Sequence, residues 1–557
     1  MKETARATEC ASMMPPGTDI HSNRRLIWEI RSLEYRYPGG QVGLRGINLN
    51  IFEKDRIALV GHNGAGKTTL VHHLNGLFRP SSGTVLYEGL RLEGDQVGKA
   101  RHRIGVLFQD PDDQLFCNTL DEDVAFGPQN QGLEPDEVEH RVVTSLRKVG
   151  IENLRYKPPH RLSYGQKKRA ALATILAMEP EILILDEPTA NLDPRQEANF
   201  TDLLMEFEGT LICISHDLPF LYRLCSRAVV LEDGDIHHDF SMQDLVTYKK
   251  YLREHGLDFT FRLSCCQGGN NGHNGSEGSH HHVHDIPAVH ERRSPALAGK
   301  EYAAARPLIE LSGYSYRYPD GSRGIREMDL SIREAESIAI LGENGAGKST
   351  LVSCIAGIRT GDGKYVFDGD IVSKKERKEL WRHIGIVFQD PADQLFCPSC
   401  REEVAFGPKQ LKLSKDETRT RVEEALALVR LTGFEDRVPH KLSAGERKRL
   451  SIAAVLAMKP RVLILDEPTA NLDPQSEQLL CEILLHLPVT KILISHDIDI
   501  ISILSERTVV MHEGRIIRDY PTSFFLRDEH LISLNGLDYT LKNACCREIM
   551  KLQEAAS

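Results

Sequence analysis

Hydrophobic and polar positions follow the same order twice along this 557-residue chain. In each half an early stretch alternates apolar and polar residues, as in IWEIRSLEYRYP followed by GINLNIF, and this period of two predicts antiparallel strands. A middle section, roughly residues 115–178 in the first half, has apolar positions at helical spacing, for example in PDEVEHRVVTSLRKVG. Continuous apolar runs follow, such as EILILDEP and RVLILDEP, which are typical of parallel strands buried on both faces. The pattern predicts, in each half, an α/β core with a helical insertion.

The repeat extends over whole domains. Equivalent residues recur 280 positions apart, in the pairs Gln109 and Gln389, Ser163 and Ser443, Asp186 and Asp466, and His216 and His496. Even the tails repeat, because GLDFTFRLSCC in the first half returns as GLDYTLKNACC in the second. Two homologous units of about 220 residues lie within the usual size of a domain. We therefore predict the following organisation: a disordered N-terminus at 1–26, a first domain at 27–245 with an extension at 246–267, a flexible Gly/His-rich linker at 268–307, and a second domain at 308–526 with an extension at 527–557.

Composition excludes several classes of protein. The formal net charge of −11 argues against a nucleic-acid-binding surface. No window approaches 18 apolar residues, so we expect no membrane-spanning segment, and the N-terminus has no apolar core of the signal-peptide kind. The 12 cysteines are scattered, several within apolar segments such as LICIS, which is typical of reduced thiols in a cytoplasmic protein.

Two glycine-rich loops carry the clearest chemical signal. GHNGAGKT at Gly61–Thr68 and GENGAGKS at Gly342–Ser349 both match G-x-x-x-x-G-K-[ST], and each follows an apolar run that predicts a strand. Glycines let consecutive backbone N–H groups approach phosphate oxygens, and the lysine reaches the same oxygens as a point charge. The chain is therefore predicted to bind two nucleotides. The loop residues expected to contact them are Asn63, Gly64, Gly66, Lys67, Thr68, Thr69, Asn344, Gly345, Gly347, Lys348, Ser349 and Thr350.

Acidic residues and histidines follow the buried strands. Asp186 and Asp466 close apolar runs, where a carboxylate can hold Mg²⁺ together with the hydroxyls of Thr68 and Ser349. The adjacent Glu187 and Glu467 are expected to act as general bases toward an attacking water. His216 and His496, each in an ISHD sequence after the next run, are expected to reach the γ-phosphate and hold the water and the glutamate in place. An aspartate–glutamate pair after a strand can also be a helix N-cap, but its recurrence beside two phosphate loops favours catalysis.

Further motifs resemble those of the ABC-type ATPases over nearly the whole of both halves. LSYGQKKR at Leu162–Arg169 and LSAGERKR at Leu442–Arg449 are similar to the signature sequence of that family. NLD at Asn191–Asp193 and at Asn471–Asp473 is similar to its D-loop, and the ISHD histidines to its switch. The resemblance implies two tandem P-loop NTPase domains, each with an antiparallel β subdomain, a RecA-like core and a helical signature subdomain.

The resemblance also implies an arrangement of the sites. Two such domains sandwich two ATP molecules head to tail, so Ser163 and Gly165 would complete the site built on Lys348. Ser443 and Gly445 would complete the site built on Lys67. By the same resemblance, Tyr37 and Tyr318 would stack on adenine, and the Q-loop residues Gln109 and Gln389 would contact ATP and Mg²⁺.

Both signatures depart from the family pattern at their third position. Tyr164 and Ala444 stand there in place of glycine, and the last residue is Gln166 or Glu446. The contacting serine and glycine remain in both signatures, so hydrolysis is expected at both sites.

The segment after each Q-loop points to a subfamily. FQDPDDQLFCNTLDEDVAFGPQNQGL and FQDPADQLFCPSCREEVAFGPKQLKL resemble the energy-coupling factor importers, the group that includes cobalt and nickel uptake ATPases. The resemblance implies a peripheral protein on the cytoplasmic face of the cell membrane. It would drive a separate membrane coupling subunit and a substrate-capturing membrane subunit for a metal ion or a vitamin. Asp113, Gln114, Phe116 and their counterparts Asp393, Gln394 and Phe396 are expected to line the docking grooves.

Two alternatives stay open beside the importer. A soluble twin ABC ATPase acting on ribosomes usually has a long charged helical linker or an iron–sulfur domain, and neither is evident here. A DNA-repair ATPase would need a long heptad insertion, for which the 95 or so residues between Lys67 and Ser163 leave no room. The six histidines between His273 and His290 suit either a metal-chelating segment or a plain hydrophilic tether.

Overall fold

The computed structural model describes residues 24–190, 192, 194–247, 252, 307–343, 345–525, 548, 549 and 551–553. Most of the predicted N-terminal tail and both C-terminal extensions fall outside these ranges, as does nearly all of the predicted linker, with its histidines. Asn191 and Asp193 of the first D-loop and Asn344 of the second phosphate loop also lie outside the described residues.

The first half contains the elements β1 Leu26–Arg36, β2 Val42–Phe52, β3 Arg56–Val60, α2 Lys67–Leu74, β4 Ser82–Tyr87, β5 Leu90–Arg91, α3 Asp95–Arg101, β6 Ile104–Leu107, α4 Leu120–Asn130, α5 Pro135–Lys148, α6 Tyr164–Leu176, β7 Ile182–Asp186, α7 Pro194–Met205, β8 Thr210–Ile214, α8 Leu218–Leu224, β9 Arg227–Glu232, β10 Asp235–Ser241 and α9 Met242–Thr247. Short 3₁₀ turns lie between them, among them η1 Pro111–Asp113.

The second half repeats this order as β11 Pro307–Arg317, β12 Arg323–Arg333, β13 Ser337–Leu341, α13 Lys348–Ile355, β14 Asp362–Phe367, β15 Asp370–Ile371, α14 Lys374–Arg377, β16 Ile384–Val387, α15 Cys400–Gln410, α16 Lys415–Leu428, α17 Ala444–Leu456, β17 Val462–Asp466, α18 Pro474–His486, β18 Thr490–Ile494, α19 Ile498–Leu504, β19 Arg507–His512, β20 Arg515–Pro521 and α20 Thr522–Phe525.

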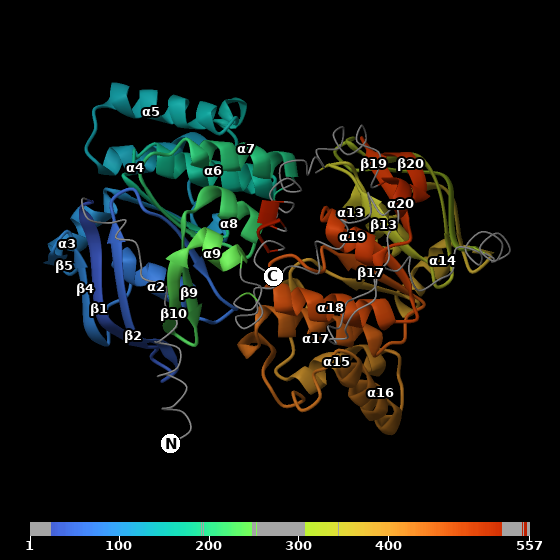
Figure 1. Ribbon diagram of the computed structural model, residues 1–557. Helices are drawn as coiled ribbons and strands as arrows, with labels where there is room; N and C mark the ends of the chain where they lie inside the picture. Colours follow the sequence, from blue (N-terminus) through green and yellow to red (C-terminus); the bar gives the residue numbers. More distant parts are fainter. Residues whose placement is uncertain are drawn as a thin grey trace, which may run out of the picture.

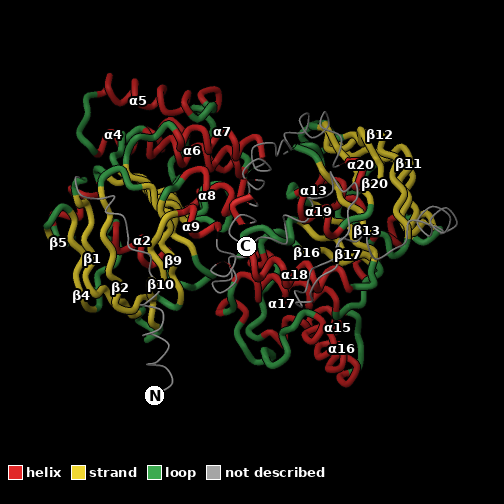
Figure 2. Tube along the Cα trace, in the orientation of Figure 1, coloured by secondary structure: helices red, strands yellow, loops and turns green. Residues whose placement is uncertain are grey.

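The described residues of each half form two sheets. An antiparallel sheet of order β2-β1-β4-β5 recurs as β12-β11-β14-β15, and a six-stranded sheet of order β10-β9-β3-β8-β7-β6 recurs as β20-β19-β13-β18-β17-β16. Within the six-stranded sheets every pairing is parallel except that of β10 with β9 and of β20 with β19. The predicted antiparallel strands, buried parallel strands and α/β class are confirmed (Figure 2).

Side-chain alternation divides the core of each half into two clusters on either side of the six-stranded sheet. On β3, Ile57 and Leu59 belong to the cluster under the antiparallel sheet, whereas Ala58 and Val60 belong to the cluster under the helical insertion. Because successive side chains of a strand point to opposite faces, one five-residue apolar run supplies both clusters. Because both faces of the central strands are buried, their sequences are continuous apolar runs.

The helical insertions lie at opposite ends of the molecule. Helices α4, α5 and α6 cover one end of the first half, and α15, α16 and α17 lie at the far end of the second half (Figure 1). The two halves are thus placed head to tail. None of the helices within the described ranges combines the length and apolar character needed to cross a bilayer.

A turn of helix near the C-terminus packs on the first half rather than on its own. Ile549 is fully buried in the cluster that includes α8 and α9, and Leu552 packs beside it. The Gln553 side-chain amide donates to the Val246 carbonyl at 2.8 Å, and the Tyr222 hydroxyl donates to Glu548 at 3.2 Å. The end of the chain therefore supports the domain at its beginning.

Candidate functional site

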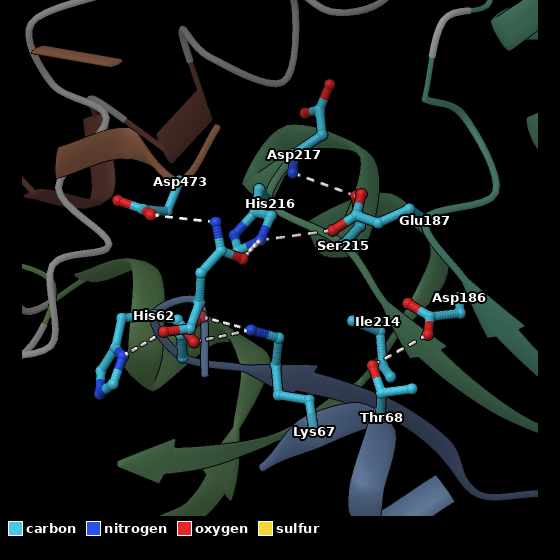
Figure 3. Close-up of polar contacts among 12 residues, drawn as sticks. His62, Lys67, Thr68, Asp186, Glu187, Ile214, Ser215, His216, Asp217 and Asp473 are labelled. Carbon is cyan, nitrogen blue, oxygen red and sulfur yellow. Dashed lines mark hydrogen bonds and ion pairs between the residues drawn. The ribbon is translucent and has the colours of Figure 1, made fainter. Parts of the chain in front are cut away.

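The two phosphate loops join a buried strand to a helix, as their sequences predict. β3 leads into Gly61–Thr68 and α2, and β13 leads into the equivalent loop before α13. The Lys67 ammonium donates to the carbonyls of Gly61 and His62 at 2.8 and 3.0 Å, and Lys348 does the same with Gly342 and Glu343 at 2.7 and 3.1 Å. Burial lowers the pKa of Lys67, while the charges of Glu187 and Asp186 partly offset that effect. A cation is thus held within each loop, as Figure 3 shows for Lys67.

Glycine is required at the residue that precedes each lysine. Gly66 and Gly347 have φ of 102° and 98°, in the left-handed region, and serve as N-caps of α2 and α13. A Cβ atom on Gly66 would lie 2.8 Å from the Gly43 carbonyl oxygen, and one on Gly347 would lie 2.5 Å from that of Gly324. The loop therefore closes tightly against the antiparallel sheet.

Oxygen donors suited to Mg²⁺ meet at the end of β7. The Thr68 hydroxyl donates to an Asp186 carboxylate oxygen at 3.1 Å, and Gln109 lines the same cavity. Hydroxyl, carboxylate and amide oxygens are the ligands that Mg²⁺ prefers, so the residues fit this ion. Burial raises the pKa of Asp186, and the Thr68 bond and the Lys67 charge partly offset it.

In the second half, Asp466 lies with Ser349 and Gln389 on one cavity. Burial and the neighbouring Glu467 raise the pKa of Asp466 to about 6. Both carboxylates would gain from a nearby cation, because a positive charge favours their ionised form.

The two glutamates adopt a backbone conformation that the sequence does not reveal. Glu187 and Glu467 have φ of 45° and 40°, in the left-handed region that costs free energy for a residue with a Cβ atom. Each accepts a hydrogen bond from the serine of the ISHD sequence, Ser215 at 3.3 Å and Ser495 at 3.2 Å. Burial and the charge of Asp186 raise the pKa of Glu187 to about 7. Strained, largely buried carboxylates at the end of a parallel strand are typical of catalytic groups.

The two switch histidines have different partners. His216 Nε2 is 3.0 Å from the Asn63 side-chain oxygen and 3.6 Å from Glu187. His496 Nδ1 is 2.7 Å from Glu467, which also accepts from the His496 backbone N–H. Burial and the charge of Lys67 lower the pKa of His216 to about 3. Burial lowers the pKa of His496 too, but the charge and hydrogen bond of Glu467 outweigh it, and the net direction is upward.

Residues from both halves meet at the first site. The Asn63 amide donates to Asp473 of the second half's D-loop at 3.2 Å, so a chain of contacts runs from Asp473 through Asn63 to His216 (Figure 3). The cavity of about 340 Å³ around Lys67 is lined mainly by the first half and by Asn471 of the second. Asp473 also caps α18, by accepting from the Ser476 N–H at 2.8 Å.

A second, larger cavity of about 1830 Å³ is lined by residues of both phosphate loops, among them Thr68 and Ser349. It brings Ser163 of the first signature together with Lys348, Ser349 and His496, and it also reaches Ser443. Gly165 and Gly445 do not line it. A Cβ atom on Gly165 would lie 2.0 Å from Gln196, and one on Gly445 would lie 2.5 Å from Ser476, so each glycine packs against a helix of its own half.

Tyr37 and Tyr318 each follow the first strand of their half. Their hydroxyls lie 2.7 Å from the hydroxyls of Thr69 and Thr350, in the helix that starts at the phosphate loop. Each tyrosine ring lines a cavity that contains the loop lysine of the same half. The rings are thus anchored beside the phosphate loops, as expected of residues that stack on a nucleobase.

The sequence motifs did not reveal the contacts of three groups of residues around these sites. Ser215 and Ser495 hold the glutamates, Asp473 reaches the opposite phosphate loop, and Lys168 and Lys448 are buried beneath the Q-loops. The serines and lysines recur 280 positions apart, and this recurrence was the available signal. Nothing in the local sequence indicates that Asp473 contacts the other half.

Comparison with known proteins places the chain in a family. The sequence model described as ABC transporter matches residues 44–190 and 325–470. An ABC transporter ATP-binding protein of Methanosarcina acetivorans is 33% identical, and the match covers 97% of this chain and 92% of that protein. One from Bifidobacterium longum is 35% identical over 86% of this chain, and the match spans 64% of the length of that protein.

Among solved structures, CbiO1 of Clostridium perfringens, part of the ABC transporter complex CbiONQ, is 38% identical. It covers 43% of this chain and 97% of its own, with a TM-score of 0.38. Three observations lead to one conclusion. The phosphate loops are repeated, carboxylates stand at the ends of β7 and β17, and the family model matches both halves. The chain belongs to the ABC transporter family, as an ATP-binding, ATP-hydrolysing component with two tandem ATPase domains.

Proposed function

We propose that this protein is the energising subunit of an energy-coupling factor type importer, on the cytoplasmic face of the cell membrane. It would drive uptake of a metal ion or a vitamin through a membrane coupling subunit and a substrate-capturing subunit. Two ATP molecules would bind between the halves of one chain, each held by one phosphate loop and the opposite signature serine. The head-to-tail placement of the helical insertions and the cavities lined by both halves support this pairing.

The observation that carries the importer assignment is a pair of exposed phenylalanines in each half. Phe116 and Phe396 are 67% and 68% exposed. Each packs edge to face on a second exposed ring, Phe126 or Phe406, with ring centroids 5.0 Å apart. A large aromatic surface exposed at the same place in both domains is typical of a protein-binding site.

A buried carboxylate holds the backbone of each loop that carries Phe116 or Phe396. Buried Asp123 accepts from the N–H groups of Phe116 and Cys117, both at 3.0 Å. Buried Glu403 does the same for the N–H groups of Phe396 and Cys397, at 2.9 and 2.7 Å. Because the backbone is already ordered, binding a partner there costs little additional conformational entropy. Phe116 and Phe396 are therefore exposed side chains on an ordered backbone.

The other residues predicted to line the grooves divide into two groups. Asp113 and Asp393 are exposed three residues before Phe116 and Phe396, at the edge of the larger cavity, and remain candidates for contact with a partner. The Gln114 side-chain amide instead donates to the Ala171 carbonyl of α6 at 2.9 Å, and Gln394 donates to the Ser451 carbonyl of α17 at the same distance. These glutamines join the loop to the signature helix and are left out of the proposed docking surface.

For hydrolysis, we assign the general base to Glu187 in the first site and Glu467 in the second. Glu187 Oε1 is buried and has no hydrogen-bond partner within the described part of the chain, so it can accept a proton from an attacking water. Mg²⁺ would be held by Thr68, Gln109 and Asp186, or by Ser349, Gln389 and Asp466, and would neutralise charge on the phosphates. His216 and His496 would orient the water and the glutamate, and Lys67 and Lys348 would bind phosphate oxygens.

The test is co-purification of the full chain with membrane proteins of its own cell. Phe116→Ala with Phe396→Ala should abolish capture of membrane partners and leave basal ATP hydrolysis unchanged, because neither ring lines the nucleotide cavities. Phe524→Ala is the matched control, since Phe524 is 63% exposed on α20, in neither of these loops. Reversing the charge of Asp113 and Asp393 together should also uncouple transport, and because both carboxylates line the larger cavity, basal ATP hydrolysis is measured separately for this variant. Sedimentation with ribosomes, and no membrane partner, would exclude the importer and favour a soluble twin ABC ATPase.

A further inference from the structure

Each half contains a fully buried lysine that the hydrolysis scheme does not use. Lys168 on α6 and Lys448 on α17 are 0% and 1% exposed. Burial lowers the pKa of each to about 8, and the charges of the nearby catalytic carboxylates partly offset that effect. Burying an ammonium group is costly unless it is well hydrogen-bonded, so the recurrence of this lysine in both halves calls for a physical reason.

The ammonium groups bind backbone carbonyls of the Q-loop. Lys168 Nζ donates to the carbonyls of Phe108 and Gln109 at 3.3 and 2.7 Å. Lys448 Nζ donates to those of Phe388 and Gln389, both at 2.9 Å, and to that of Glu467 at 3.4 Å. Lys448 thus bonds, with all three of its N–H groups, to the two segments that bear the Q-loop glutamine and the catalytic base.

This position connects the two composite sites. α6 starts immediately after Ser163, which shares the larger cavity with Lys348 of the second phosphate loop, and Lys168 is one turn further along the same helix. The carbonyl that Lys168 binds belongs to Gln109, which lines the cavity of the first site. If nucleotide binding at the second site displaces α6, Lys168 would therefore transmit that displacement to the Q-loop of the first site.

The role of each lysine depends on its hydrogen-bond donors and not on its bulk. Replacing both partners of a buried ion pair by apolar residues of similar volume is often neutral or stabilising, but replacing the lysine alone leaves the loop carbonyls without these donors. A methionine would fill the same space under the Q-loop without the desolvation cost. What methionine lacks is a set of N–H donors that keeps the loop carbonyls in register with the helix.

We propose that Lys168 and Lys448 are positioning residues that couple each signature helix to the Q-loop of its own half, and so link turnover at the two ATP sites. The proposal rests on the composite sites proposed above. It assigns no proton transfer to either lysine, since each acts through the backbone that carries Gln109 or Gln389.

The two halves differ in the other side-chain contacts that join the signature helix to the Q-loop segment. In the first half the Tyr164 hydroxyl also donates to the Gln109 carbonyl at 3.2 Å, and Lys167 binds Asp112 at 2.6 Å. Ala444 and Ala392 stand in place of Tyr164 and Asp112 in the second half, and neither has a side chain that could make such a bond. Loss of Lys448 should therefore be more damaging than loss of Lys168.

The experiment compares Lys448→Met and Lys168→Met in the full chain, with exposed Lys415→Met on α16 as the matched control. Lys448→Met should lower kcat for ATP at least about tenfold while KM and the ATP dissociation constant stay within about twofold, because misplacing a catalytic group affects turnover more than binding. Lys168→Met should lower kcat by only about threefold, since one neutral hydrogen bond and an exposed ion pair remain. Lys448→Arg keeps the charge and the donors and should recover much of the lost rate.

Thermal unfolding of each variant provides the second readout. An unchanged Tm with reduced kcat supports positioning, whereas a lower Tm with activity restored on cooling would show that the lysine is only structural. An unchanged kcat in both methionine variants would overturn the proposal, as would an increase in KM alone. Glu187→Gln with Glu467→Gln, measured alongside, tests the hydrolysis scheme. If that variant keeps its ATPase activity, the proposed sites are wrong, whatever the lysine variants show.

Discussion

The catalytic glutamate and switch histidine are the same residue types in both halves, yet they are arranged differently. In the second half His496 contacts Glu467 directly, at 2.7 Å. In the first half His216 turns to Asn63, and its distance to Glu187 is 3.6 Å. The backbone conformation of the two glutamates is nearly the same, with φ of 45° and 40°, so the difference lies in the side chains and their partners.

The partner of His216 is itself held by the opposite half. Asn63 donates to Asp473, and so the first histidine is linked to the second half's D-loop by two consecutive contacts. The same motif residues can therefore have different side-chain partners at the two sites. At the first site, the histidine's partner is held by a contact between the domains, which each domain's own sequence cannot report.

The largest expected effect is loss of either base. Glu187→Gln and Glu467→Gln should each leave ATP binding intact and reduce hydrolysis at their own site by roughly 10²–10⁴-fold, because general base catalysis typically contributes that factor. Single-turnover ATPase assays and nucleotide-binding titrations measure the two effects separately. Glu423→Gln, at an exposed position of α16, is the control. If either catalytic substitution left turnover untouched, the difference between the sites would be one of competence and not of arrangement.

The next effect concerns stability, and it should distinguish the halves. Ile549→Ala should destabilise the first domain by about 2–5 kcal/mol, the usual cost of truncating a fully buried isoleucine. The second domain should be unaffected, because Ile549 packs among residues of the first. Calorimetric unfolding of the full chain would report the two domains separately, with exposed Lys551→Ala on the same turn as the control. Equal shifts in both transitions would contradict the packing described here.

Much of this architecture could be predicted because it follows from local periodicity. The alternation in β1 and the continuous apolar run of β7 each reflect which faces of the strand are buried, and this leaves a direct trace in residue type. The phosphate loops were equally accessible, since Gly66 needs a backbone conformation that excludes other residues. The sequence therefore predicted both sheets, the helical insertion and the residues around the phosphates.

The parts that could not be predicted depend on long-range contacts. Asp473 looks like a helix N-cap, which it is, and its contact with Asn63 across 410 positions has no local signature. The left-handed backbone at Glu187 is imposed by its surroundings and not by its residue type. Lys168 was overlooked because a lysine in a signature helix is usually exposed, and only its recurrence as Lys448 marked it.

A smaller effect is expected from cutting the link between the halves. Asp473→Ser keeps an oxygen that can cap α18 but is too short and uncharged to hold Asn63. With the first site isolated by Glu467→Gln, this change should slow hydrolysis about tenfold, the value of a hydrogen bond to a charged group. With the second site isolated by Glu187→Gln, the rate should stay within about twofold. Equal losses in the two backgrounds would show that Asp473 acts through the stability of its own domain.

The smallest expected effect concerns the different contacts between signature helix and Q-loop in the two halves. Tyr164→Phe removes one hydroxyl and keeps the ring, so alone it should slow turnover by at most about threefold, the value of a single neutral hydrogen bond. Combined with Lys168→Met, it removes both side-chain donors to the Gln109 carbonyl and leaves the ion pair of Lys167 with Asp112 as the remaining difference from Lys448→Met. The double variant should then fall toward the rate of Lys448→Met, and the loss should exceed the product of the two single effects. Strictly multiplicative losses would mean that Tyr164 and Lys168 act independently, and the weaker dependence of the first half on its lysine would need another cause.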